Sequence, residues 1–135
     1  MALPNEKFEE IKSKIQNFID NEMVVHENDF NINHKFADHL PFLEEKRNKV
    51  REMGLFSPQI SKEYGGLGLS LHQLGQIYEI LGKTFYGLYV FNCQAPDAGN
   101  MEILIEHGTD YQKETFLKPL VAVSYTHLTL PTISD

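Results

Sequence analysis

The side chains best able to do chemistry in this sequence are six histidines and a single cysteine. The histidines are His26, His34, His39, His72, His107 and His127. None forms an i,i+4 pair, and neither a His-Glu-x-x-His segment nor a second cysteine accompanies them, as a zinc site would require. Surface or helix-capping histidines are therefore favoured over a metal site. Cys93 is expected to be a buried apolar thiol rather than a nucleophile.

A glycine cluster, Gly65, Gly66 and Gly68, is the second candidate site. It leads into an expected helix N-terminus at Ser70, where backbone N–H groups and the helix dipole favour anions. However, no Lys-Ser/Thr pair follows it, Leu71 stands where a dinucleotide fingerprint has its third glycine, and no strand precedes it. A structural turn between helices is favoured, with phosphate or nucleotide binding as the alternative.

Composition limits the classes of function. The chain has 135 residues, with 12 Lys and Arg against 19 Asp and Glu, and a formal charge of −7. This acidic balance disfavours nucleic-acid binding, which needs a basic face. One cysteine excludes an internal disulfide, and no apolar run approaches the roughly 20 residues of a membrane helix. Because the first ten residues resemble neither a signal nor a transit peptide, a cytoplasmic protein is expected.

Apolar spacing predicts the elements that must position these residues. A first helix runs from an N-cap at Asn5 to about Met23, and residues 26–33 form a loop. Its inner face comprises Phe8, Ile11, Ile15, Phe18 and Ile19. A second helix spans Pro41 to Met53, ending at a left-handed Gly54. Its inner residues are Leu43, Val50 and Met53, and its solvated residues are Glu44, Glu45, Lys46 and Lys49.

The second half of the chain shows two capping boxes. Turn residues fill 57–69, and then Ser70 with Gln73 starts a third helix. Its apolar face comprises Leu71, Leu74, Ile77, Tyr78, Leu81 and Phe85, and Gly75 and Gly82 on the same stripe predict the close approach of another helix. Residues 87–92 form a short helix, and another opens at Pro96 and Asp97 and ends at Gly108. Thr109 with Gln112 starts a last helix that Pro119 closes. The sequence thus predicts an all-α, bundle-like domain of five or six helices without a substantial sheet.

The tail departs from this pattern. Residues 123–135 are rich in Ser and Thr and have no helix signal, so that they could form a short strand or a frayed end. We therefore divide the chain into a helical domain, residues 1–122, and a tail, residues 123–135.

Several segments together resemble the N-terminal helical domain of acyl-CoA dehydrogenases, over about residues 5–122. They are Arg51–Phe56, Pro58 with Tyr64–Ser70, Leu81-Gly82, Phe91–Glu102, and Gly108-Thr109 followed by Gln112-Lys113. The segment Phe91–Glu102 resembles the sub-branch of family members ten and eleven.

The resemblance implies a flavoenzyme that binds FAD and oxidises an acyl-CoA thioester to its trans-2-enoyl form in fatty-acid oxidation. A carboxylate removes the α-proton in this family, and the β-hydrogen leaves as hydride to the flavin. The resemblance further implies an acyl-CoA substrate, electron-transfer flavoprotein or a similar protein as electron acceptor, and a homo-oligomeric full-length enzyme. A bacterial, cytoplasmic source is expected.

The chain departs from the family after Ala122, where the flavin-binding β-domain should begin and a foreign-looking tail stands instead. We therefore expect a fragment without the catalytic base and most of the FAD site, and no catalytic residue can be assigned. By resemblance, Asn92, Ala95 and Gly99 would line the acyl pocket at helix-compatible spacing. The alternative is that these small residues only let helices pack. A stand-alone helical interaction module without a cofactor is the second hypothesis for the chain.

Overall fold

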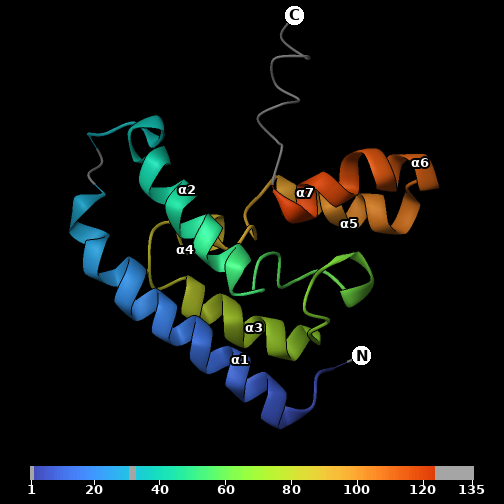
Figure 1. Cartoon of the computed structure of the whole chain (residues 1–135), viewed down its shortest axis with the longest axis horizontal. Helices are drawn as coiled ribbons and strands as arrows, with labels where there is room; N and C mark the ends of the chain where they lie inside the picture. The colour runs from blue at the N-terminus through green and yellow to red at the C-terminus, as the bar shows by residue number, and fades with distance from the viewer. Residues whose placement is uncertain (1, 31–32, 124–135) are drawn as a thin grey trace, which may run out of the picture.

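The computed structural model describes residues 2–30 and 33–123, and every regular element in these ranges is helical (Figure 1). No strand occurs among them, so the predicted all-α class is confirmed. The predicted tail comprises residues 123–135, and all of it after Val123, including His127, lies outside the described residues.

Helix α1 (Asn5–Phe18) buries the predicted face, from Phe8 to Phe18, and continues into the π-helix η1 (Ile19–Met23). Its N-cap is Pro4 rather than Asn5, because Asn5 already has helical geometry. The expected loop after residue 26 is wrong in part. A 3₁₀ helix, η2 (Val24–Asp29), covers residues 26–29 of the expected loop.

Helix α2 (Phe36–Glu52) begins five residues earlier than predicted. Asp38 accepts a hydrogen bond from the backbone N–H of Lys35 at 2.9 Å and so helps to cap the helix start. Pro41 therefore lies inside the helix instead of starting it, and its missing N–H interrupts one i→i−4 hydrogen bond. Gly54 has the predicted left-handed conformation, with φ of +74°.

The two faces of α2 differ from the prediction at two positions. Lys46 was expected to be solvated, but it is only 5% exposed. Met53 was expected to be inside, but it is 40% exposed because the helix ends one residue before it.

Helix α3 (Leu71–Leu81) follows the short 3₁₀ helix η3 (Lys62–Tyr64) and has the predicted capping box of Ser70 and Gln73. Two residues of its predicted inner face, Leu71 and Phe85, are instead exposed. Gln73 of the same helix is buried instead. Its side-chain amide accepts a hydrogen bond from the backbone N–H of Leu3 and donates one to the carbonyl of Leu3.

The expected close helix approach at Gly75 and Gly82 is wrong. A Cβ at Gly75 would meet nothing within 4 Å, and one at Gly82 would meet only carbonyls of its own helix.

The remaining elements form a helical hairpin after the short helix α4 (Gly87–Val90). Helix α5 (Asp97–His107) packs against the π-helix η4 (Lys113–Leu117) and α7 (Lys118–Ala122), with α6 (Asp110–Gln112) at the bend. The Thr109–Gln112 capping box is confirmed. Pro119 does not close the last helix. It lies in the first turn of α7, where its missing N–H costs least.

Two hydrophobic cores result. The main core unites buried side chains of α1, η1, α2, α3 and α4. The hairpin core is smaller and consists of Ile60, Met101, Leu117 and Val121, with partly buried neighbours. In Figure 1 the hairpin lies to one side of the main body, beyond the end of α2.

Candidate functional site

The three residues expected to line an acyl pocket do not share one helix. Asn92 lies in a turn after α4, Ala95 precedes Pro96 in a cis peptide, and Gly99 lies in the first turn of α5. Asn92 is buried, whereas Ala95 and Gly99 are exposed. The expected helical spacing is therefore wrong for Asn92 and Ala95. The role of the three residues in an acyl pocket stays a prediction.

Asn92 instead lies at the centre of a buried network of hydrogen bonds, which we call the junction. Its Nδ2 donates to Oγ of Ser57 at 2.9 Å and to the carbonyl of Leu120 at 2.8 Å. Its own carbonyl accepts from Nε2 of Gln59 at 2.9 Å. The Ser57 hydroxyl in turn donates to the carbonyl of Val121 at 2.6 Å. The junction thus ties the end of α7 to two turns of the main body.

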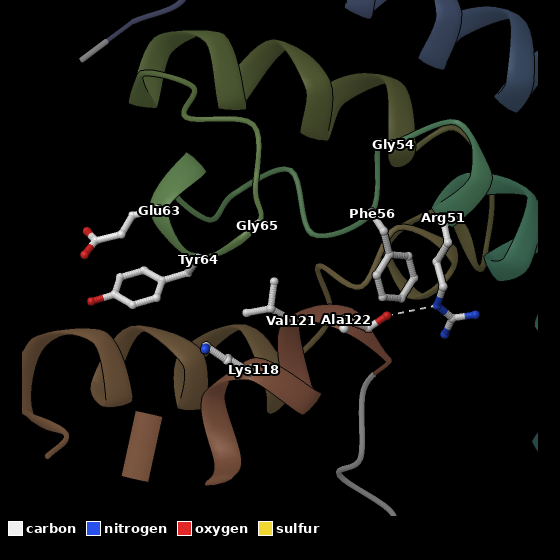
Figure 2. Close-up of a pocket in the computed structure, with 9 residues that line it drawn as sticks. All are labelled: Arg51, Gly54, Phe56, Glu63, Tyr64, Gly65, Lys118, Val121 and Ala122. Carbon is white, nitrogen blue, oxygen red and sulfur yellow. Dashed lines mark hydrogen bonds between the residues drawn. The ribbon is translucent and has the colours of Figure 1, made fainter. Parts of the chain in front are cut away.

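A pocket of about 420 Å³ lies beside this junction, between the end of α2, the glycine turn and α7 (Figure 2). Its apolar lining includes Phe56, Tyr64 and Val121, and Arg51 and Lys118 contribute cations. The cations have partners already. Arg51 donates to the carbonyl of Ala122 at 3.0 Å, and Lys118 donates to the carboxylate of Glu114 in η4 at 2.6 Å.

Gly65 of the glycine cluster lines this pocket, and the geometry of the cluster favours the structural turn over a phosphate cradle. Gly65 and Gly68 have positive φ, and a Cβ at Gly66 would lie 1.9 Å from the carbonyl oxygen of Ile60. The N-terminus of α3 is also occupied, since Ser70 and Gln73 satisfy each other's backbone N–H groups. The capping box thus takes two of the N–H groups at this helix start.

The described residues do not fit a flavin dinucleotide by themselves. A pyrophosphate needs convergent backbone N–H groups or unpaired cations. Here the capping box takes the N–H groups of Ser70 and Gln73, and carbonyls hold the guanidinium of Arg51. The pocket is consequently an unsuitable flavin site, and no step of a flavin reaction can be derived from it.

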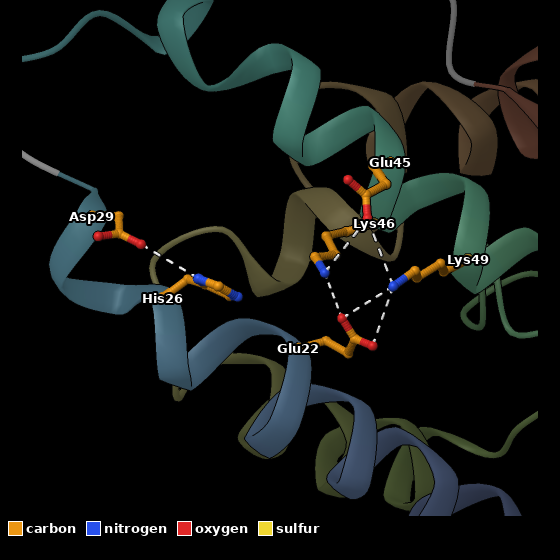
Figure 3. A network of polar contacts seen from close by, with 6 residues as sticks. All are labelled: Glu22, His26, Asp29, Glu45, Lys46 and Lys49. Atoms are coloured by element: carbon orange, nitrogen blue, oxygen red, sulfur yellow. Dashed lines mark hydrogen bonds and ion pairs between the residues drawn. The ribbon is translucent and has the colours of Figure 1, made fainter.

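A second polar cluster joins η1 to α2 (Figure 3). Glu22 bonds to the buried Lys46 and to Lys49, whose Nζ lies 3.3 Å from Oε1, and Glu45 lies 3.7 Å from the same Nζ. The hydrogen bond from Lys46 is the main cause that lowers the pKa of Glu22. This pairing explains how a lysine can be buried in α2, and it gives the cluster a structural role.

Histidines and the cysteine offer little further chemistry. No group of three or more potential metal ligands comes together within residues 2–30 and 33–123. His39 is buried against the ring of Phe30, contrary to the expectation of surface histidines. Cys93 is buried as expected, donates to Oε1 of Gln59 at 3.2 Å, and has its thiol pKa raised by burial.

Sequence reasoning missed the arginines of α2. Arg47 is 1% exposed, and its guanidinium lies 4.3 Å from the centre of the Tyr89 ring and 4.9 Å from that of Phe56. Arg51 lies 4.4 Å from the same Phe56 ring. The only available signal was the segment Arg51–Phe56, which the family resemblance included without assigning a role.

Comparisons with known proteins agree with this architecture. The model of the acyl-CoA dehydrogenase N-terminal domain matches residues 5–124. Among curated proteins, acyl-CoA dehydrogenase family member 10 of Mus musculus is 37% identical over 87 residues, and family member 11 of the same species is 42% identical over 97 residues. These matches cover 60% and 64% of this chain, but only 8% and 12% of the relatives.

A solved structure of a protein described as an acyl-CoA dehydrogenase from Mycobacterium abscessus superposes with a TM-score of 0.76 at 30% identity. It covers 90% of this chain, which corresponds to 33% of that protein. None of the helices in the described ranges is long and apolar enough to cross a bilayer. Because the family model spans most of the sequence, this chain belongs to the acyl-CoA dehydrogenase family and carries its N-terminal domain.

Proposed function

We propose that residues 1–122 are the helical N-terminal domain of an FAD-dependent acyl-CoA dehydrogenase that oxidises acyl-CoA thioesters to trans-2-enoyl-CoA. The observation that carries this proposal is the family match over residues 5–124. A structural likeness over 90% of the chain, to a protein about three times as long as the matched part, supports it. The complete enzyme would supply the flavin site, the catalytic carboxylate and the oligomer contacts, and would pass electrons to electron-transfer flavoprotein or a similar acceptor. This chain alone would be inactive.

The contribution of this domain is a wall of the acyl pocket at the start of α5. Ala95 and Gly99 are exposed there, and a Cβ at Gly99 would meet nothing within 4 Å. Small side chains beside open space leave room for an acyl chain that other domains would enclose. Asn92 is buried and cannot touch a substrate in this arrangement, so its contribution would be the position of the turn that precedes α5.

A domain exchange tests the function and the wall together. Residues 5–122 replace the matching part of the Mycobacterium abscessus protein, and thioester-dependent dye reduction and bound flavin are measured. We expect the exchanged enzyme to retain FAD and to oxidise an acyl-CoA. A folded, flavin-loaded exchange protein without thioester oxidation would contradict the proposal.

Gly99→Leu in the exchanged enzyme then tests the wall. We expect kcat/KM for long-chain thioesters to fall about tenfold or more, because added side-chain volume competes with the acyl chain, while flavin content stays constant. Gly75→Leu is the matched control, since Gly75 is also an exposed helical glycine with open space around its Cβ position. Equal effects of the two substitutions would remove Gly99 from the pocket.

A further inference from the structure

The last carbonyl groups of α7 are held by side chains from elsewhere in the chain. Normally the last four carbonyls of a helix lack full helical partners and turn to solvent or to capping groups. Here the carbonyl of Leu120 accepts from Nδ2 of Asn92 at 2.8 Å, and that of Val121 accepts from Oγ of Ser57 at 2.6 Å. Each donor comes from a turn of the main body, far from α7 in sequence.

The next two carbonyls are held by arginines of α2. The carbonyl of Ala122 accepts from Nε of Arg51 at 3.0 Å, as Figure 2 shows. The carbonyl of Val123 accepts from Nη2 of Arg51 at 3.2 Å and from Nη2 of Arg47 at 3.3 Å. Four side chains thus donate hydrogen bonds to four consecutive carbonyls. We call these four donor residues the α7 socket: Arg47, Arg51, Ser57 and Asn92.

Two members of the α7 socket have an uncommon backbone conformation. Ser57 and Asn92, with φ of +56° and +60°, are the non-glycine residues with positive φ within the described ranges. This conformation costs free energy for residues with a Cβ and persists only where the surroundings determine it. The two side chains also bond to each other at 2.9 Å, so the strained turns meet at the end of α7.

Charge complementarity favours the same arrangement. The C-terminal end of a helix carries partial negative charge, which nearby cations stabilise. Arg47 is almost fully buried, and burial lowers the pKa of its guanidinium. A buried cation is unfavourable unless polar partners surround it. Carbonyls of Val123 and Tyr89 and the faces of aromatic rings serve as these partners.

Apolar contacts alone would fix the orientation of the hairpin relative to α2 less precisely. Of the four residues of the hairpin core, only Ile60 lies outside the hairpin. Since hydrophobic contact is non-directional, this small core restricts the orientation of α5 and α7 to α2 less than directional hydrogen bonds do. Directional hydrogen bonds from the α7 socket supply that orientation.

We propose that the α7 socket fixes the direction in which the chain leaves the helical domain, and that its four residues are positioning residues for the domain that follows in the complete enzyme. This inference rests on the proposed function, because only a longer dehydrogenase has a following domain to place.

Spin-label distances in the 135-residue chain test the inference directly. Labels at Val123→Cys and Glu9→Cys, in a Cys93→Ala background, report the distance between the end of α7 and the exposed side of α1. We expect one narrow distribution for the parent chain.

Asn92→Asp keeps a residue that tolerates the left-handed conformation but replaces a donor with a carboxylate. Arg51→Met removes both guanidinium bonds to the carbonyls of Ala122 and Val123, and Ser57→Gly removes the hydroxyl without adding backbone strain. We expect each to lose the single narrow population.

Matched controls separate the α7 socket from general effects. Asn100→Asp makes the same chemical change at an exposed residue of α5, and we expect it to leave the distribution narrow. Arg51→Lys returns a cation and we expect it to restore part of the narrow population. Amide exchange gives the second readout, with α7 amides about tenfold faster or more in Asn92→Asp and α1 amides unchanged.

Two results would overturn the inference: distributions as narrow as the parent's in Asn92→Asp and Arg51→Met, or exchange that accelerates equally in α1 and α7. Neither readout uses flavin or thioester. Failure of this test therefore does not contradict the proposed function. Conversely, an inactive exchange protein would not change the spin-label distances measured here.

Discussion

The main core and the hairpin are held by different forces. In the main core, α1, α2, α3 and α4 bury a continuous set of apolar side chains, and Phe8, Ile15 and Ile19 are almost completely excluded from solvent. The hairpin has a small apolar core and reaches the main body largely through the polar α7 socket. Substitutions in the first region should therefore change global stability, and those in the second should change local order.

Phe8→Ala should have the largest effect, because Phe8 is 1% exposed in the main core. A buried Phe→Ala replacement typically costs about 3–5 kcal/mol of unfolding free energy. Urea unfolding followed by circular dichroism would measure it. Leu71→Ala is the control, since Leu71 is 84% exposed on α3 and should change stability by less than about 0.5 kcal/mol. Similar losses in the two variants would argue against a dominant main core.

Met101→Ala tests the hairpin in the same way. Met101 is fully buried in the hairpin core, and its truncation should cost about 2–5 kcal/mol of local stability. We expect faster amide exchange throughout α5, η4 and α7, with little change in α1. If α1 amides accelerate as much as those of α5, the two cores unfold as one unit and the contrast between them fails.

The two capping boxes allow a matched comparison. Ser70 caps α3 beside the main core, and Thr109 caps α6 at the bend of the hairpin. Removal of an N-cap side chain costs about 1 kcal/mol in either setting. Ser70→Ala should lower the global free energy of unfolding by that amount. Thr109→Ala should instead increase exchange only in the hairpin, and a global loss from it would contradict separate stabilities.

The same contrast explains what sequence could and could not predict. The face of α1 and both capping boxes depend on residues within one or two turns of each other, and sequence spacing predicted them. Burial of Lys46 depends on Glu22 of another element, and local spacing carries no signal of it. Asn92 was expected in a helix because neither its left-handed backbone nor its contact with the distant Ser57 is encoded locally.

The smallest effect should come from Glu22, whose carboxylate joins η1 to α2 within the main body. Its pKa is lowered by the hydrogen bond from Lys46, with further contributions from Lys49. A lowered pKa in the folded state means that the unfolded state binds more protons. The stabilisation is therefore complete above the ordinary value of 4.5 and is lost as pH falls below it. Because Glu22 is partly solvated, we expect only about 0.5 kcal/mol.

Glu22→Gln isolates this contribution. We expect the variant to be less stable than the parent at pH 7 and the difference to shrink towards pH 3, as urea titrations at several pH values would show. Glu10 also has a lowered pKa, caused mainly by Lys14, but it is present in both proteins and so cancels in the difference. Glu79→Gln, at an exposed position of α3, is the control and should show no such pH dependence. A difference in unfolding free energy that stays constant from pH 7 to pH 3 would mean that Glu22 acts through packing. The ion pairs of Glu22 with Lys46 and Lys49 would then contribute as little as an ordinary surface pair.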